Sequence, residues 1–149
     1  MNADYQQSFL TLAGYSVIIA AVFFKVPQLV KIWKKGSTQG LSRKGAYAEL
    51  LSYFNTMAYA RHLNLDISIY GETVLISAQN LLVILAIFYF DKKIKLHEKM
   101  LFLGLFSLYS TVLLADTSLT SQHWHLISSS VILCSAFARG SQFLENWKN

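Results

Sequence analysis

The sequence has one cysteine and one proline among its 149 residues, and few charged side chains. A single cysteine, Cys134, excludes both a disulfide framework and a zinc site built on cysteine pairs. A basic stretch ahead of the first apolar run is also absent, because Asp4 is the only charged side chain before Phe9. A cleavable signal peptide carries such a stretch, so we expect the first run to remain as a helix.

Charged residues make up 14% of the chain and hydrophobic residues 54%. Soluble domains usually carry about a quarter charged residues. The apolar residues also gather in long runs, separated by short charged stretches, and a helix needs about 20 mostly apolar residues to cross a bilayer. We therefore expect an all-α protein, a multi-pass transmembrane helical bundle whose main surroundings are the lipid bilayer.

The apolar runs predict about five helices. The third contains an unbroken apolar stretch from Leu81 to Phe90, whereas the second is short and the least hydrophobic. Buried helices of soluble proteins can show similar runs, so the positions of the charges must decide between the two classes. The predicted ranges are 9–30, 45–60, 69–90, 100–115 and 124–143.

Lysine and arginine gather in two of the loops between these runs. The other two loops, residues 64–70 and 116–123, contain neither. This alternation follows the positive-inside rule if the N-terminus faces the lumen or the exterior. The net charge of +5 is thus divided between short loops, which argues against a nucleic-acid partner. The basic residues are Lys31, Lys34, Lys35, Arg43 and Lys44 in the first loop, and Lys92, Lys93, Lys95 and Lys99 in the other.

The beginning and the end of the chain share a pattern at one constant offset. Ser16-Val17-Ile18, for example, recurs as Ser130-Val131-Ile132. Duplicated helical units are typical of transporters, whereas chance similarity between two apolar helices is the alternative. Further matches pair Phe23 with Phe137, Lys25 with Arg139, Gln28 with Gln142, and Trp33-Lys34 with Trp147-Lys148.

The only proline lies near the end of the first predicted helix. Pro27 lacks a backbone N–H and crowds the carbonyl of Phe23, and inside lipid that carbonyl needs another partner. The adjacent Gln28 offers both donors and an acceptor. Together they predict a hinge or a polar gate, although a tolerated kink at a helix end is the simpler alternative.

A longer motif surrounds this proline. Lys25-Val26-Pro27-Gln28 precedes a basic stretch, then Ser37-Thr38-Gln39-Gly40-Leu41-Ser42, then Glu49-Leu50. This order resembles the PQ-loop family, whose repeats carry Pro-Gln followed by Ser-x-x-Gly-Leu-Ser. Gly71-Glu72 and Ala78-Gln79 are similar to the branch of the mannose-P-dolichol utilisation defect 1 protein and the PQ-loop repeat-containing protein 3, of the solute carrier family 66 type. The resemblance implies a motif or hinge formed by Pro27, Gln28, Gly40, Leu41 and Ser42.

The resemblance implies a fold of three helices, a linker helix and three more, with a lumenal N-terminus. Residues 9–90 would form the first three-helix PQ-loop repeat, 91–123 the linker helix with its flanking loops, and 124–149 the first helix of an incomplete second repeat. Ser141 stands where a second Pro-Gln pair would place its proline, and the last two helices have no counterpart. The implied function is an endomembrane carrier or facilitator, for a small solute or for the use of mannose-P-dolichol in the endoplasmic reticulum. Lysosome and Golgi are the alternative locations.

Polar residues inside the second and third predicted helices suggest a path for a ligand. Ionisable residues within a span are costly and usually face a bundle interior or a cavity. Glu49 and Glu72 lie near helix ends, so an interfacial position is their alternative. For Gln79 and Asn80 the alternative is packing between helices. The candidate polar path consists of Glu49, Asn55, Glu72, Gln79, Asn80 and Gln142.

The sequence shows no catalytic triad, no glycine-rich phosphate loop and no metal-binding cluster. His123 and His125 flank Trp124, which is typical of an anchor at the membrane interface rather than of a metal site. We therefore expect a non-enzymatic protein without metal or cofactor. The first hypothesis is the carrier. The second is a truncated family member that pairs with itself or with another membrane protein, without transport activity of its own.

Overall fold

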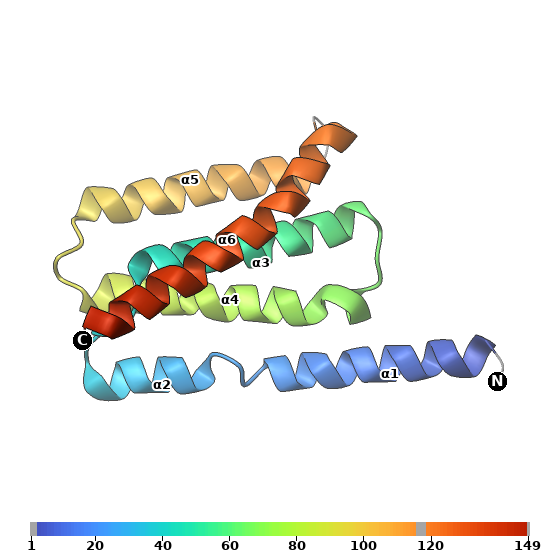
Figure 1. The fold of residues 1–149 in the computed structure, drawn as a ribbon, viewed down its shortest axis with the longest axis horizontal. Coiled ribbons are helices and arrows are strands. Elements are labelled where there is room, and N and C mark those ends of the chain that lie inside the picture. Colours follow the sequence, from blue (N-terminus) through green and yellow to red (C-terminus); the bar gives the residue numbers. More distant parts are fainter. Residues whose placement is uncertain (1–2, 116–118, 149) are drawn as a thin grey trace.

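The computed structural model describes residues 3–115 and 119–148, and Figure 1 shows their helical arrangement. These residues contain no strand, which confirms the all-α fold class. Most helices extend beyond the predicted ranges by a few residues, most of all at the first predicted helix, which corresponds to α1 and α2 together. The helices are α1 (Ala3–Ala21), α2 (Val26–Lys35), α3 (Arg43–His62), α4 (Ile67–Phe90), α5 (Leu96–Ala115) and α6 (Ser121–Lys148).

The first predicted helix is divided into α1 and α2. The N–H groups of Val22, Phe23 and Phe24 bond to carbonyls three residues earlier, at 3.1–3.2 Å, so the chain tightens into a turn. Helix α2 then begins at Val26 and holds Pro27 in its first turn. Proline fits the start of a helix, where its missing N–H has no intrahelical partner, but it disrupts a helix interior. The break therefore falls directly before the proline.

Successive segments run in opposite directions, with α1 and α2 counted as one segment (Figure 1). The α2–α3 and α4–α5 loops consequently lie at the same end of the bundle. Arg43 confirms their proximity, because its guanidinium lies 3.8 Å from Asp91 and 3.4 Å from Glu98. Both lysine-rich loops are therefore at one end, as the charge alternation predicts.

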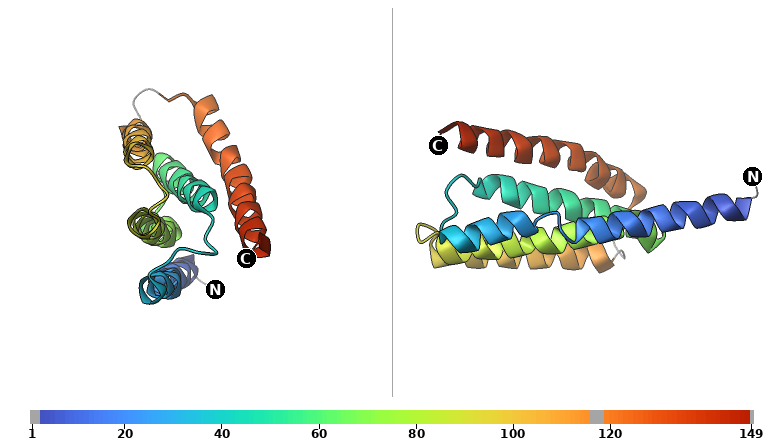
Figure 2. Two further views of the ribbon diagram at one scale, coloured as in Figure 1. Left: turned by 90° about the vertical axis from the view of Figure 1, so that its left-hand side faces the viewer. Right: turned by 90° about the horizontal axis from the view of Figure 1, so that it is seen from below.

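Helix α4 lies between the α1–α2 segment and α3, while α6 crosses obliquely over the other side of α3 (Figure 2). The main core forms where α2, α3 and α4 meet. Leu50, Val83, Ile84 and Ile87 lie there, each at most 1% exposed. The C-terminal part of α6 approaches this region from the side, so four helical segments enclose the space between them.

Helices α3 and α6 are joined by short polar side chains. The hydroxyls of Ser52 and Ser135 lie 2.7 Å apart, and Asn55 donates to the Ser130 hydroxyl at 2.9 Å. Small residues allow helices to approach closely, and hydrogen bonds between helices stabilise contacts inside a membrane. The polar face of α3 is therefore used for packing against its neighbour.

Three helical segments of the described chain are long and apolar enough to cross a bilayer: Ser8–Lys35, which joins α1 and α2, α4, and α5. Large apolar side chains cover much of the outer surface. Phe9, Ile19, Leu105 and Ile132, for example, are 59–73% exposed. Soluble monomers rarely expose apolar surface on this scale, so the structure fits a protein embedded in a membrane.

Candidate functional site

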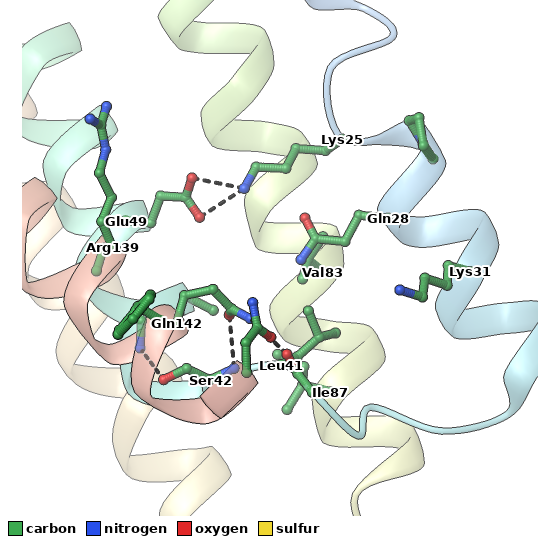
Figure 3. Close-up of a pocket in the computed structure, with 17 residues that line it drawn as sticks. Lys25, Gln28, Lys31, Leu41, Ser42, Glu49, Val83, Ile87, Arg139 and Gln142 are labelled. Atoms are coloured by element: carbon green, nitrogen blue, oxygen red, sulfur yellow. Dashed lines mark hydrogen bonds and ion pairs between the residues drawn. The ribbon is translucent and has the colours of Figure 1, made fainter. Parts of the chain in front are cut away.

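A cleft of about 700 Å³ opens between α2, α3, α4 and α6, at the end of the bundle that carries the basic loops. Figure 3 shows side chains from all four helices around it. Its walls combine charged, amide and apolar groups. The lining residues are Lys25, Pro27, Gln28, Lys31, Gly40, Leu41, Ser42, Gly45, Ala46, Glu49, Val83, Ile87, Ala138, Arg139, Gln142, Phe143 and Asn146.

An ion pair crosses the inner end of the cleft. The ammonium of Lys25 lies 2.8 and 2.7 Å from the two carboxylate oxygens of Glu49 on α3. Tyr53, one turn further along α3, donates its hydroxyl to the same carboxylate at 3.2 Å. The Lys25 side chain is only 9% exposed. A buried cation requires such a partner, because desolvation of an unpaired charge is costly.

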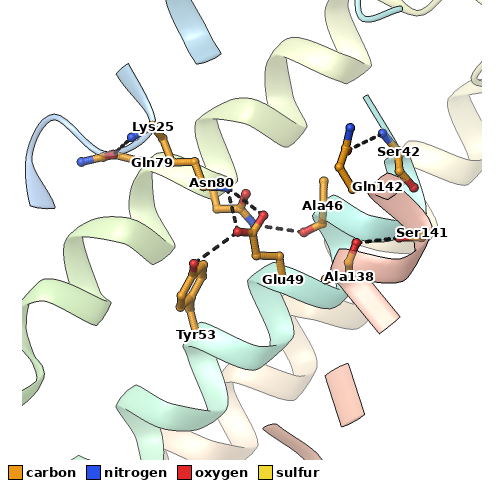
Figure 4. A network of polar contacts seen from close by, with 10 residues as sticks. All are labelled: Lys25, Ser42, Ala46, Glu49, Tyr53, Gln79, Asn80, Ala138, Ser141 and Gln142. Atoms are coloured by element: carbon orange, nitrogen blue, oxygen red, sulfur yellow. Dashed lines mark hydrogen bonds and ion pairs between the residues drawn. The ribbon is translucent and has the colours of Figure 1, made fainter. Parts of the chain in front are cut away.

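Gln79 on α4 stabilises the break between α1 and α2. Its amide nitrogen donates to the carbonyls of Ala21 and Val22, at 2.8 and 2.9 Å. Its amide oxygen accepts from the backbone N–H of Lys25 at 2.8 Å (Figure 4). A broken helix leaves backbone groups without intrahelical partners, and inside lipid these must be satisfied within the protein. One side chain therefore fixes both sides of the break.

The Gly40-Leu41-Ser42 turn forms another wall of the cleft. Gly40 has a φ of +83°, a left-handed conformation that glycine adopts without steric cost. Ser42 caps α3, because its hydroxyl accepts from the N–H of Gly45 at 3.1 Å. Gln142 on α6 donates to the Gly40 carbonyl at 2.6 Å and accepts from the Ser42 N–H at 3.0 Å. This turn is thereby attached to α6.

The two segments that match in sequence face each other across this space. Lys25 and Gln28 lie on the α2 side, and their counterparts Arg139 and Gln142 lie on α6. The two segments differ at the position of Pro27, which is Ser141 in α6. Helix α6 continues unbroken through Ser141, whose hydroxyl donates to the Ala138 carbonyl at 2.9 Å. Only the proline-containing copy is broken, which agrees with the effect of proline on a helix.

The structure brings together seven of the residues singled out from the sequence. The cleft residues are Pro27, Gln28, Gly40, Leu41, Ser42, Glu49 and Gln142. Asn80 is 1% exposed and donates to the Ala46 carbonyl at 2.9 Å, so it joins α4 to α3. Asn55 lies between Ser130 and Tyr109, whose hydroxyl donates to it at 2.6 Å. Glu72, Gln79, Asn55 and Asn80 thus lie outside the cleft lining.

Sequence reasoning missed the cleft roles of Lys25, Lys31 and Arg139. Basic residues near the end of a membrane-spanning helix are usually attributed to the membrane interface. These three were therefore not distinguished from the other basic residues near the same end of the bundle. A signal was nevertheless present, because Lys25 and Arg139 occupy matching places in the internal repeat. Among the residues that the structure describes, no three His, Cys, Asp or Glu side chains gather as a metal site.

The apolar helices and the cleft define a class of membrane-embedded helical protein with a cleft of mixed polar and apolar lining between its helices. Residues 9–69 match the family model described as the PQ loop repeat. The matched part covers less than half of the chain, but it contains the helix break, the Gly40-Leu41-Ser42 turn and all of α3. The match and the apolar helices fit a membrane protein of a transporter-like family. No solved structure matches this chain significantly.

Proposed function

We propose that this chain is a PQ-loop-type membrane carrier or facilitator and not an enzyme. The observation that carries the proposal is the cleft itself, which places the broken helix opposite the matching part of α6. The volume of about 700 Å³ is within the range of small-molecule sites, which is roughly 300–1,000 Å³. The basic loops support a cytosolic position for this end of the bundle and a lumenal N-terminus in this proposal.

The broken helix supplies the moving part. Transporters with discontinuous helices bind their substrates where backbone is unwound and satisfied by neighbouring groups. Here Gln79 holds the break against α4, while Gln142 holds the Gly40-Leu41-Ser42 turn against α6. Movement of α2 about the break would change the distance between Gln28 and α6, and so would open or close the cleft.

The cargo in this proposal is a small solute. Alternatively, the protein promotes the use of mannose-P-dolichol in the endoplasmic reticulum, as its resemblance to that branch implies. Both versions assign Pro27 and Gln28 the same roles, a hinge and a polar group that faces the ligand. They differ in readout, since the first predicts solute flux and the second predicts a change in mannose transfer to glycans.

Alanine variants of these two residues test the proposal. Pro27→Ala and Gln28→Ala should abolish solute flux in proteoliposomes, or mannose-donor use in cells that lack the protein, while membrane insertion stays intact. Gln122→Ala is the matched control, because Gln122 is an exposed residue of α6 that does not line the cleft. Full activity of both cleft variants, in both assays, would refute the proposal.

A second function, that of a membrane interaction partner, is favoured by a separate apolar cavity. This cavity of about 770 Å³ lies between α3, α5 and α6 and includes Tyr47, Phe102 and Leu105 in its walls. Large apolar residues such as Ile132 and Leu133 of α6 are also 73% and 72% exposed. Solute flux through the purified chain alone would favour the carrier, whereas activity only with a second membrane protein would favour this alternative.

A further inference from the structure

The cleft ends at the Lys25–Glu49 pair. Among the lining residues, Glu49 lies furthest from the basic loops along α3, and Val83 lies furthest from them along α4. Figure 3 shows both oxygens of Glu49 directed at the Lys25 ammonium, across the space between their two segments. The pair therefore forms the inner wall of the cleft and separates it from the half of the bundle beyond.

Polar side chains continue beyond the pair. Tyr53 donates its hydroxyl to the Glu49 carboxylate at 3.2 Å from the far side (Figure 4). Glu49, Tyr53 and Thr56 follow one another at intervals of four and three residues, so they lie on one side of α3. Glu72 of α4 lies close enough to act electrostatically on the Tyr53 hydroxyl, and acidic residues within a span usually face a bundle interior or a cavity. Polar groups on both sides of the pair are expected of a closed path rather than of a cavity floor.

The Lys25 side chain can separate from Glu49 without loss of the helix break. Gln79 of α4 holds only the backbone of Lys25, since its amide oxygen accepts from the Lys25 N–H at 2.8 Å. The ammonium reaches Glu49 at the end of a flexible four-carbon stem. Rotation of that stem would therefore break the ion pair while α4 still holds the break in place.

The chemistry of the pair also suits a contact that opens and closes. A permanent contact between helices does not require charges, because replacement of a buried ion pair by apolar residues of similar size is often neutral or stabilising. Leu50 and Ile84 already supply such apolar packing between α3 and α4. An ammonium and a carboxylate are readily hydrated once they separate, whereas apolar surface is not. The pair can thus exclude water when it is formed and admit water when it is broken.

We propose that the Lys25–Glu49 pair is the gate that closes the cleft toward the opposite end of the bundle, with Tyr53 as the residue that positions the carboxylate. The structure then represents the state that is open at the basic end and closed at the pair. Separation of the two charges would connect the cleft with the polar face around Tyr53 and Thr56. This inference rests on the proposed function, because a gate serves a protein that lets a solute pass. Its test uses no solute, so the two proposals fail separately.

The test measures how far a small, membrane-impermeant thiosulfonate reaches from the side of the basic loops. The full chain carries a single introduced cysteine in a Cys134→Ala background and lies in sealed membrane vesicles. Labelling of Lys34→Cys identifies the vesicles whose basic loops face outward, because Lys34 is exposed at that end of α2.

Two further cysteines report on the two sides of the pair. Lys31→Cys reports on the cleft, because Lys31 lines it. Thr56→Cys reports on the region beyond, since Thr56 is half-buried and its hydroxyl donates to the Ser52 carbonyl of its own helix at 3.0 Å. With the pair intact, the reagent should label Lys31→Cys rapidly and Thr56→Cys hardly at all.

Removal of both charges should open the gate. Lys25→Gln combined with Glu49→Gln leaves no unpaired charge, and labelling of Thr56→Cys should become about tenfold faster or more, because the closed state loses its charge-assisted contacts. Exchange of the charges, Lys25→Glu with Glu49→Lys, should restore slow labelling, since the pair can form again. Arg43→Gln with Glu98→Gln is the matched control, because it removes an ion pair of 3.4 Å at the same end of the bundle and outside the cleft lining. This control should leave the labelling slow.

Any of four results would overturn the gate. They are rapid labelling of Thr56→Cys with the pair intact, unchanged labelling after both charges are removed, a faster rate that the charge exchange does not reverse, and an equally faster rate in the control. The thermal stability of each variant shows whether a faster rate reflects unfolding. Unchanged labelling in the pair variants, together with lost flux in Pro27→Ala, would overturn the gate alone. Labelling that depends on the pair, together with full flux in the Pro27 and Gln28 variants, would overturn the carrier alone.

Discussion

The ammonium of Lys25 and the carboxylate of Glu49 form a two-pronged ion pair, with both nitrogen–oxygen distances at 2.8 Å or less. Lys25 is the residue directly before α2, so the pair connects the break in the first span to the middle helix of the bundle. Since Gln79 binds the backbone of the same residue, two different helices fix the break at one position.

Removing the carboxylate should destabilise the fold. In Glu49→Gln the Lys25 ammonium stays buried without a counter-charge, so we expect the free energy of unfolding to fall by about 2–4 kcal/mol. Thermal or denaturant unfolding in detergent measures this loss. Glu98→Gln is the control, because its contact with Arg43 is exposed and a surface pair contributes about 0–1 kcal/mol.

A double-variant cycle isolates the pair itself. The combination of Lys25→Gln with Glu49→Gln should cost less than the sum of the two single variants, because each single variant leaves one charge without its partner and the double variant leaves none. Strict additivity of the three free energies would show that the two side chains do not interact in the folded protein.

The amide of Gln79 should be needed for the broken helix. Gln79→Leu preserves the size of the side chain but removes three hydrogen bonds to the backbone of Ala21, Val22 and Lys25. We expect a loss of about 1–3 kcal/mol in unfolding free energy, together with faster amide exchange around the break. Gln28→Leu should leave stability nearly unchanged, and equal losses in both variants would contradict the role of Gln79.

The contact between α3 and α6 should depend on Gly45. A methyl group at this position would lie 2.7 Å from the Ser141 hydroxyl and 3.0 Å from the Ala138 carbonyl, so Gly45→Ala forces the helices apart. We expect a loss of about 1–3 kcal/mol in unfolding free energy.

Gly140→Ala is the control for that variant. Gly140 lies on α6 and has open space around it, so alanine should be neutral or stabilise the helix by about 0.5–1 kcal/mol. A stability loss at Gly140 as large as at Gly45 would show that helix separation is not the cause.

The proposed orientation can be measured with single cysteines. In a Cys134→Ala background, Lys34→Cys should react with a membrane-impermeant maleimide only from the cytosolic side. Asp66→Cys should react only from the lumenal side, because it lies in the loop at the opposite end of the bundle. Labelling of both positions from one side would contradict the antiparallel arrangement across the membrane.

The location of the helix break could be anticipated from Pro27, but its stabilisation could not. A proline in a sequence shows which carbonyl loses its donor, because the affected bond is local. Gln79 lies 54 residues further along the chain. From the sequence, Gln79 was interpreted as part of a polar path or of the packing between helices. Only the position of α4 beside α1 and α2 shows which backbone groups its side chain contacts.

The candidate polar path was predicted from faces of single helices, and the structure distributes its members differently. Glu49 and Gln142 line the cleft, whereas Asn55 and Asn80 form contacts between helices. A helical face shows that side chains point in one direction. It does not show whether a neighbouring helix or an open cavity lies in that direction.

The sequence by itself determined the all-α class, the approximate helix ranges and the separation of the basic loops from the others. These properties depend on local composition, because each span must satisfy its own backbone hydrogen bonds and bury its own apolar surface. Only the tertiary structure decided that Gln142 contacts Gly40 and Ser42, about one hundred residues earlier. It also placed Lys31 and Arg139 on the walls of one cleft. Such contacts depend on how helices cross, which the packing of all of them sets together.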